Sequence, residues 1–126
     1  MPSIARTPEE VHRLWTEYFI AGDLDGLVSL YEPEATFAAQ PGASVTGLLA
    51  IREVLSRFVA VRRMFEIEIG RALQSGDLAL MVSSWKLRGE QRGSPYETNG
   101  RTADVVRRQP DGSWRFVIDS PYGEGA

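Results

Sequence analysis

The chain has 126 residues, of which 43% are hydrophobic and 25% charged, and its formal net charge is −3 at pH 7. These values suit one globular domain, residues 1–126, and the absence of cysteine excludes disulfide bonds, thiolate catalysis and cysteine-ligated metals. The 14 basic residues are scattered among acidic ones and form no basic stripe, so we expect no nucleic-acid partner.

The first helix has a clear start and a clear end. Thr7 is a candidate N-cap, Pro8 suits the first helical position, and Glu10 lies where a capping box requires an acid. Gly22 is expected to end the helix. Apolar residues recur at helical spacing and predict one buried face: Val11, Leu14, Trp15, Tyr18 and Phe19.

A short second helix is expected after Asp23, with an apolar face of Leu24, Leu27, Val28 and Tyr31 and a stop at Pro33. Residues 35–38 are a candidate strand and residues 40–43 a loop. The third helix opens at residues 46–47. Its inward positions are Ile51, Val54, Leu55 and Phe58.

From about residue 64 the period changes to two, which is typical of strands. We expect strands over residues 65–69, 78–87, 96–108 and 114–119, with a polar loop at residues 89–95. Turns are expected at residues 75–77 and 110–112. A helical first half and an extended second half predict an α+β fold with helices on one face of an antiparallel sheet.

This order of elements resembles the cone-shaped nuclear-transport-factor-2-like (NTF2-like) superfamily, which includes ketosteroid isomerases and SnoaL-like polyketide cyclases. Residues 34–37, the Pro-Gly loop and residues 47–53 look like its strand, loop and third-helix start, and residues 100–114 look like its final hairpin. The resemblance implies three N-terminal helices on the concave face of a curved antiparallel or mixed sheet, around a small apolar pocket.

The sequence departs from the ketosteroid isomerase pattern at one informative place. Those enzymes use an aspartate base, which falls in the loop after the first strand. Residues 38–42 contain no carboxylate, and Gln40 cannot accept a proton at neutral pH. The resemblance leaves two candidate catalytic residues, Asp104 on the penultimate strand and Asp119 at the end of the last strand.

Each aspartate has an alternative interpretation. Carboxylates are depleted inside strands, so Asp104 is either a pocket acid with a raised pKa or a residue that faces solvent or pairs with Arg107 or Arg115. Asp119 is either an acid at the pocket or a cap for the turn that follows it.

The aromatic residues supply the expected pocket wall, although each could equally be ordinary core. Trp15 and Tyr18 are of particular interest because a buried indole N–H or hydroxyl requires a partner. Together with Gln40, the predicted ligand-pocket residues are Trp15, Tyr18, Tyr31, Phe37, Phe58 and Trp85.

Other catalytic chemistries have little support in the sequence. The single histidine, His12, lies off the apolar face of the first helix, so we expect it to be solvated and no metal site to form. The serines, Ser83 among them, have no expected histidine base nearby. No glycine-rich phosphate loop follows a strand, so no cofactor is expected.

Two functions from different classes remain. The first is a cofactor-independent isomerase or cyclase that acts on a small apolar carbonyl compound, with proton transfer by Asp104 and Asp119 and an oxygen held by Tyr18 or Trp15. The second is a non-catalytic module for ligand binding or dimerisation.

The expected partners follow from the same patterns. In residues 78–82 both the odd- and the even-numbered positions are apolar, so both faces of that strand must be covered. We therefore expect a homodimer through the sheet. The sequence contains no run of about eighteen apolar residues and no signal-peptide core, which favours a cytoplasmic protein without a membrane partner.

Overall fold

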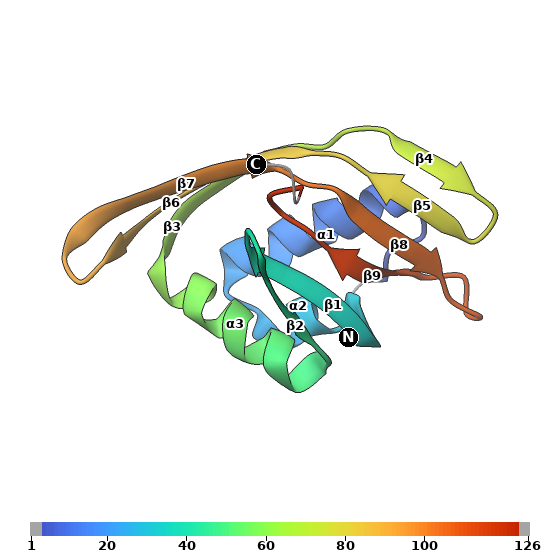
Figure 1. Ribbon diagram of the computed structural model, residues 1–126, viewed down its shortest axis with the longest axis horizontal. Helices are drawn as coiled ribbons and strands as arrows, with labels where there is room; N and C mark the ends of the chain where they lie inside the picture. The colour runs from blue at the N-terminus through green and yellow to red at the C-terminus, as the bar shows by residue number, and fades with distance from the viewer. Residues whose placement is uncertain (1–3, 124–126) are drawn as a thin grey trace.

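The computed structural model describes residues 4–123, and in that range three helices lie under a strongly curved sheet (Figure 1). They are α1 (Pro8–Ala21), α2 (Leu24–Val28) and α3 (Leu48–Val61). Thr7 caps α1 by accepting the N–H of Glu10, and Gly22 ends it in the left-handed conformation, with φ of 72°. The predicted start and end of the first helix are therefore confirmed.

The strands form a curved sheet in two parts, with both parallel and antiparallel pairs of neighbouring strands. The larger part has the order β2-β1-β9-β8-β5-β4, and the smaller has the order β3-β6-β7. Neighbouring strands are antiparallel except β1 and β9, which are parallel. The bounds are β1 (Tyr31–Gln40), β2 (Ala43–Thr46), β3 (Arg62–Glu68), β4 (Ala72–Ser75), β5 (Leu78–Met81), β6 (Ser84–Gln91), β7 (Ser94–Arg101), β8 (Asp104–Arg108) and β9 (Trp114–Asp119).

Two long strands of the prediction are each divided by a bend. The segment 78–87 becomes β5 and β6, and the segment 96–108 becomes β7 and β8. At the bend, the N–H of Ser83 donates to the hydroxyl of Thr102 at 3.0 Å, so a side chain replaces a backbone acceptor. Gly70 lies against the same place, where a Cβ atom would come within 1.8 Å of the Val82 carbonyl oxygen. The bend gives the sheet its curvature.

Two local expectations were wrong. Tyr31 begins β1 rather than completing the second helix, and β1 is longer than the expected strand 35–38, with an irregular register that accommodates Pro33. Residues 89–95 are not a loop but the tip of the β6–β7 hairpin. There Arg92 and Gly93 adopt φ of 53° and 78°, as a tight hairpin turn requires.

The helices occupy the concave side of the sheet. In Figure 1 the sheet arches over α1, with β3, β6 and β7 towards one end and β4 and β5 towards the other. The apolar face of α1 is buried as predicted at Val11, Leu14 and Phe19. Along the part of the chain that the structure describes, no helix has the length and apolarity needed to span a membrane.

Candidate functional site

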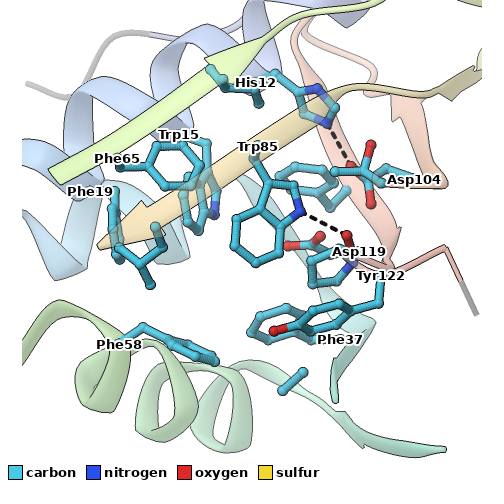
Figure 2. A pocket seen from close by; sticks show the side chains of 16 residues that line it. His12, Trp15, Phe19, Phe37, Phe58, Phe65, Trp85, Asp104, Asp119 and Tyr122 are labelled. Atoms are coloured by element: carbon cyan, nitrogen blue, oxygen red, sulfur yellow. Dashed lines mark hydrogen bonds and ion pairs between the residues drawn. The ribbon is translucent and has the colours of Figure 1, made fainter. Parts of the chain in front are cut away.

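Two buried carboxylates from adjacent strands lie at one end of a cavity (Figure 2). Asp104 is the first residue of β8 and Asp119 the last of β9, and these strands are antiparallel, so the start of one lies beside the end of the other. Asp104 is 1% exposed and Asp119 6%. The structure thus brings together the two aspartates that the sequence singled out.

His12 joins them, contrary to the expectation that it is solvated. Its ring is buried, at 3% exposure, and Nε2 lies 2.6 Å from Oδ2 of Asp104. The spacing of His12, Trp15 and Phe19, which all line the cavity, is i, i+3 and i+7, so they share one helical face. That spacing was the signal in the sequence, and the apolar pattern that starts at Val11 obscured it.

Ser83 holds the other side of the histidine ring. Its Oγ lies 2.8 Å from Nδ1 of His12 and accepts the N–H of Gly70 at 3.0 Å. The expectation that no histidine lies near a serine is therefore wrong for Ser83. Since the Ser83 oxygen already accepts one bond, its own proton can go to Nδ1, which leaves Nε2–H to donate to Asp104. Ser83 is buried and does not line the cavity, so it orients the ring rather than acting as a nucleophile.

Asp104 has hydrogen bonds on both oxygens. Besides the contact with His12, its Oδ1 accepts the backbone N–H of Ser120 at 2.7 Å. The alternative of a solvent-facing or arginine-paired aspartate is wrong, since Asp104 is buried and Arg107 pairs with Glu32 at 2.9 Å. Two strong donors at its oxygens favour the ionised carboxylate.

Asp119 has the opposite environment. Burial, and then the negative charge of Asp104, raise its pKa well above the usual range, although a hydrogen bond from Tyr31 works against this. The Tyr31 hydroxyl donates to Oδ2 of Asp119 at 2.5 Å and accepts the indole N–H of Trp15 at 3.0 Å. Burial and the charge of Asp119 also raise the pKa of Tyr31, which stays protonated. The alternative of a cap for the turn after Asp119 is wrong: among the contacts of the described residues, its side chain accepts from Tyr31 and from no N–H of that turn, where the N–H of Gly123 donates to the Ser120 carbonyl.

The cavity is lined mainly by aromatic rings and offers about 70 Å³ to the centres of water-sized atoms, where a single water needs about 10–15 Å³. We call it the inner cavity. Of the predicted wall residues, Trp15, Phe37, Phe58 and Trp85 line it (Figure 2). Besides His12, the cavity is lined by nine residues that the sequence did not indicate as pocket residues: Phe19, Ala39, Phe65, Ile67, Leu87, Thr102, Phe116, Pro121 and Tyr122.

Three predicted wall residues lie elsewhere. Tyr18 packs on α2, so close to Gly26 that a Cβ atom there would meet its ring at 2.5 Å. Tyr31 does not line the inner cavity but lies behind its wall, where its hydroxyl contacts Asp119 and Trp15 and its ring packs on Phe116. Gln40 is exposed and lines a separate, larger hollow.

The turn after β9 closes one side of the inner cavity. The indole N–H of Trp85 donates to the carbonyl of Pro121 at 2.7 Å, and its ring meets that of Tyr122 edge-on, with centroids 5.4 Å apart. The Tyr122 hydroxyl lies 3.0 Å from that of Thr98. No local pattern in the sequence predicts these contacts, because they join segments distant in the chain.

The carboxylates are not arranged as a metal site. Among residues 4–123, no group of three or more histidine, cysteine, aspartate or glutamate side chains is placed to hold a metal ion. The arrangement offers instead two buried carboxyl groups with different surroundings at one end of an aromatic cavity: an N–H donor faces each oxygen of Asp104, and the pKa of Asp119 is raised. Different surroundings for two carboxyl groups are what acid–base chemistry needs.

Solved structures share the fold at low sequence identity. A proposed calcium/calmodulin-dependent protein kinase type II association domain from Thiobacillus denitrificans has a TM-score of 0.76 and 18% identity, over 94% of this chain and 95% of that one. A proposed aromatic ring hydroxylase from Novosphingobium aromaticivorans has a TM-score of 0.73 and 19% identity, over 88% of this chain and 82% of that one. A proposed NTF2-like dehydratase from Streptomyces avermitilis has a TM-score of 0.70 and 17% identity, over 87% of this chain and 88% of that one.

A comparison with curated protein sequences finds no match. The model of the SnoaL-like domain family matches residues 11–117, which is most of the chain, from within α1 to within β9, and includes Asp104 but not Asp119. The chain belongs to the SnoaL-like domain family and has the NTF2-like fold that its sequence suggested.

Proposed function

We propose that this protein binds a small apolar carbonyl compound in the inner cavity and catalyses proton transfer next to the carbonyl group, without a cofactor. The observation that carries this proposal is the unequal pair of buried carboxylates. Asp104 has two donors that favour its charge, whereas burial and that charge keep Asp119 protonated. Separated proton affinities are what a paired acid and base require.

In the proposed reaction, the carboxylate of Asp104 takes a proton from the carbon beside the carbonyl. The electron pair moves to the carbonyl oxygen, and the acid proton of Asp119 stabilises the enolate there. In a ketone with a β,γ double bond, return of the proton from Asp104 to the γ-carbon gives the conjugated isomer. In a compound with a second carbonyl group, attack of the enolate on that group forms the C–C bond of a ring, and the proton held by Asp104 goes to the resulting alkoxide. Trp15 and Tyr18 do not hold the oxygen in this scheme, because the Trp15 N–H is bonded to Tyr31 and Tyr18 lies outside the inner cavity.

His12 and Ser83 position the base. The imidazole donates its Nε2–H to Asp104 and fixes its orientation, and Ser83 fixes the imidazole. One structural neighbour is named as a proposed dehydratase, and dehydration also uses an acid and a base.

A non-catalytic binding module is the second candidate, and one observation favours it. Both nitrogens of His12, both oxygens of Asp104 and one oxygen of Asp119 already have partners inside the protein. The polar network is therefore satisfied without a ligand, as in a structural network that only shapes a pocket.

Exchange of α-protons separates the two candidates. Cyclic ketones such as cyclohexanone and 2-tetralone are incubated with the protein in D₂O, and loss of the α-proton signals is followed by NMR. We expect exchange above the buffer rate, and a fall of about 100-fold or more in Asp104→Asn and Asp119→Asn, with no change in Glu34→Gln, an exposed acid. Ligand binding without exchange would identify the binding module.

We also propose a homodimer through the outer face of the sheet. Register places Leu73 opposite Leu80, Leu80 opposite Val105, and Val105 opposite Ile118, in one row across four strands. Leu73 is 74% exposed, and Leu80 and Ile118 are each 41% exposed. An apolar row of this extent on one face favours coverage by a second copy.

A further inference from the structure

A second, larger hollow adjoins the inner cavity, and its chemistry is different. It lies between α3, the β1–β2 hairpin and the tip of the β6–β7 hairpin, and it offers about 360 Å³ by the same measure. We call it the outer hollow. Its apolar floor includes Val45, Val54 and Val61, and its polar groups are those of Gln40, Ser44, Arg57, Gln91 and Tyr96.

The two spaces share part of their walls. Phe58 and Ala39 line both the inner cavity and the outer hollow. Phe58 is half-buried and projects from α3 at the edge of the inner cavity, on the side away from Asp104 and Asp119 (Figure 2). A ligand whose ring reaches the carboxylates therefore has its far end at Phe58, next to the outer hollow.

The outer hollow carries a positive charge. Among the described residues that line it, Arg57 is the only charged one. Its guanidinium bonds to Glu53 on the same helix at 3.0 Å, and these side chains are 70% and 71% exposed. An ion pair so exposed contributes little, so Arg57 can exchange Glu53 for another carboxylate at small cost. The guanidinium fork is well suited to bind a planar carboxylate.

We infer that the outer hollow is a subsite for the carboxylate end of an amphipathic ligand whose apolar ring occupies the inner cavity. Arg57 binds the carboxylate, and the side chain of Phe58 separates the two ends. This inference rests on the ring-binding part of the proposed function and adds the class of ligand: an aromatic or alicyclic ring that bears an alkanoate tail.

The test compares probes that differ only in the tail. The ring probe is 2-naphthol, and the tailed probes are 6-hydroxy-2-naphthylalkanoates with two to five methylene groups, each paired with its neutral primary amide. Affinity is measured by calorimetry and by quenching of tryptophan fluorescence, since Trp15 and Trp85 line the inner cavity. We expect one or two chain lengths to bind about two- to fivefold tighter as carboxylate than as amide, and the gain to shrink at high salt.

Arg57→Gln should remove that gain while leaving the affinity for 2-naphthol unchanged. Arg52→Gln is the matched control, because Arg52 lies on the same helix but pairs with Asp25 and does not line the outer hollow. Equal binding of carboxylate and amide at every length, or a gain that survives Arg57→Gln, would overturn the inference and leave the ketone exchange assay unaffected. If 2-naphthol and the tailed probes all fail to bind, the inference and the binding step of the proposed function both fall.

Discussion

The carboxylate of Asp104 is held between Nε2 of His12, which lies 92 positions earlier in the chain, and the backbone N–H of Ser120. Each oxygen therefore has its own donor, and both Asp104 and His12 are buried. Burial, and then the negative charge of Asp104, raise the pKa of Asp119. The contacts that hold Asp104 thus bear on the protonation of a neighbouring group.

The first prediction concerns the strength of that pair. His12→Ala leaves a buried carboxylate without its partner, and we expect the free energy of unfolding to fall by about 3 kcal/mol. Asp104→Ala should cost a similar amount. In the double variant the loss should be smaller than the sum by about 1–3 kcal/mol, as measured by urea denaturation. Strict additivity would mean that His12 and Asp104 contribute to stability independently.

The second prediction concerns the dependence of stability on pH. The pKa of Asp119 is raised in the folded state, so above the ordinary aspartate pKa the unfolded chain releases a proton that the folded protein keeps. Stability must therefore decrease as pH rises through that window. Asp119→Asn mimics the protonated form. At pH 8 we expect the free energy of unfolding of this variant to exceed that of the unsubstituted protein by on the order of 1 kcal/mol, and near pH 3.5 we expect little difference between the two.

Asp111→Asn is the control of opposite sign for that experiment. Hydrogen bonds from the hydroxyl and N–H of Ser113 lower the pKa of Asp111, so its contribution to stability is present at neutral pH and is lost as pH falls. A pH profile of Asp119→Asn that parallels that of the unsubstituted protein would show that Asp119 ionises normally.

The third prediction concerns the orientation of the histidine. Ser83→Ala removes the partner of Nδ1 and the acceptor of the Gly70 N–H, so we expect a loss of about 1–3 kcal/mol in stability. The ¹⁵N chemical shifts of the His12 ring should move as the tautomer preference changes, and ketone exchange should fall. Ser84→Ala, at an exposed neighbouring position, is the control and should leave all three unchanged.

The fourth prediction concerns the bend in the sheet. A Cβ atom at Gly70 would lie 1.8 Å from the Val82 carbonyl oxygen, and backbone must move to relieve that contact. We expect Gly70→Ala to cost at least about 2–3 kcal/mol in thermal or urea unfolding. Gly42→Ala is the comparison, because no atom lies near that Cβ position and only its φ of 78° opposes alanine, at about 1–2 kcal/mol. Equal costs would show that the close approach at Gly70 relaxes easily.

The fifth prediction concerns the dimer. Sedimentation at micromolar concentration should give the mass of two chains, and Leu80→Glu should reduce it to one because a charge would be buried in the apolar row. Leu49→Glu replaces a leucine that is 88% exposed on α3, away from the sheet face, and should leave the dimer intact. A single-chain mass for the unsubstituted protein would exclude the proposed interface.

Those parts of the fold that depend on local signals were predictable from the sequence. The cap at Thr7, the stop at Gly22 and the strand Trp114–Asp119 each depend on residues close together in the chain, and the structure has them where the pattern indicated. Tyr31 shows the limit of such patterns. It continues the helical spacing of Leu24, Leu27 and Val28, yet α2 ends at Val28 and Tyr31 pairs with β9. Tertiary pairing overrode a short helical signal.

The candidate site was only partly predictable. Asp104 was detectable because an acid inside a strand is unusual, whereas the contacts that define its chemistry come from His12 on another element and from the backbone of Ser120. A polar residue next to the apolar stripe of a helix normally faces water. His12 is buried instead, because α1 lies inside a curved sheet, which covers His12 as well as the apolar stripe. The curvature itself depends on the bend at Ser83 and Thr102, which a continuous pattern of alternating residues conceals.

The wide separation of His12 and Asp104 in the chain has a consequence for how the protein is made. Ribosomes add roughly 5–20 residues per second, so the 92 positions between them correspond to roughly 5–20 s of translation. During that interval α1 has been synthesised, and β3 and β5, which contact it, are added before β8 and β9. The contact between His12 and Asp104 forms only after Asp104 has been added, and until then the apolar face of α1 is only partly covered, as a segment on which a chaperone can act.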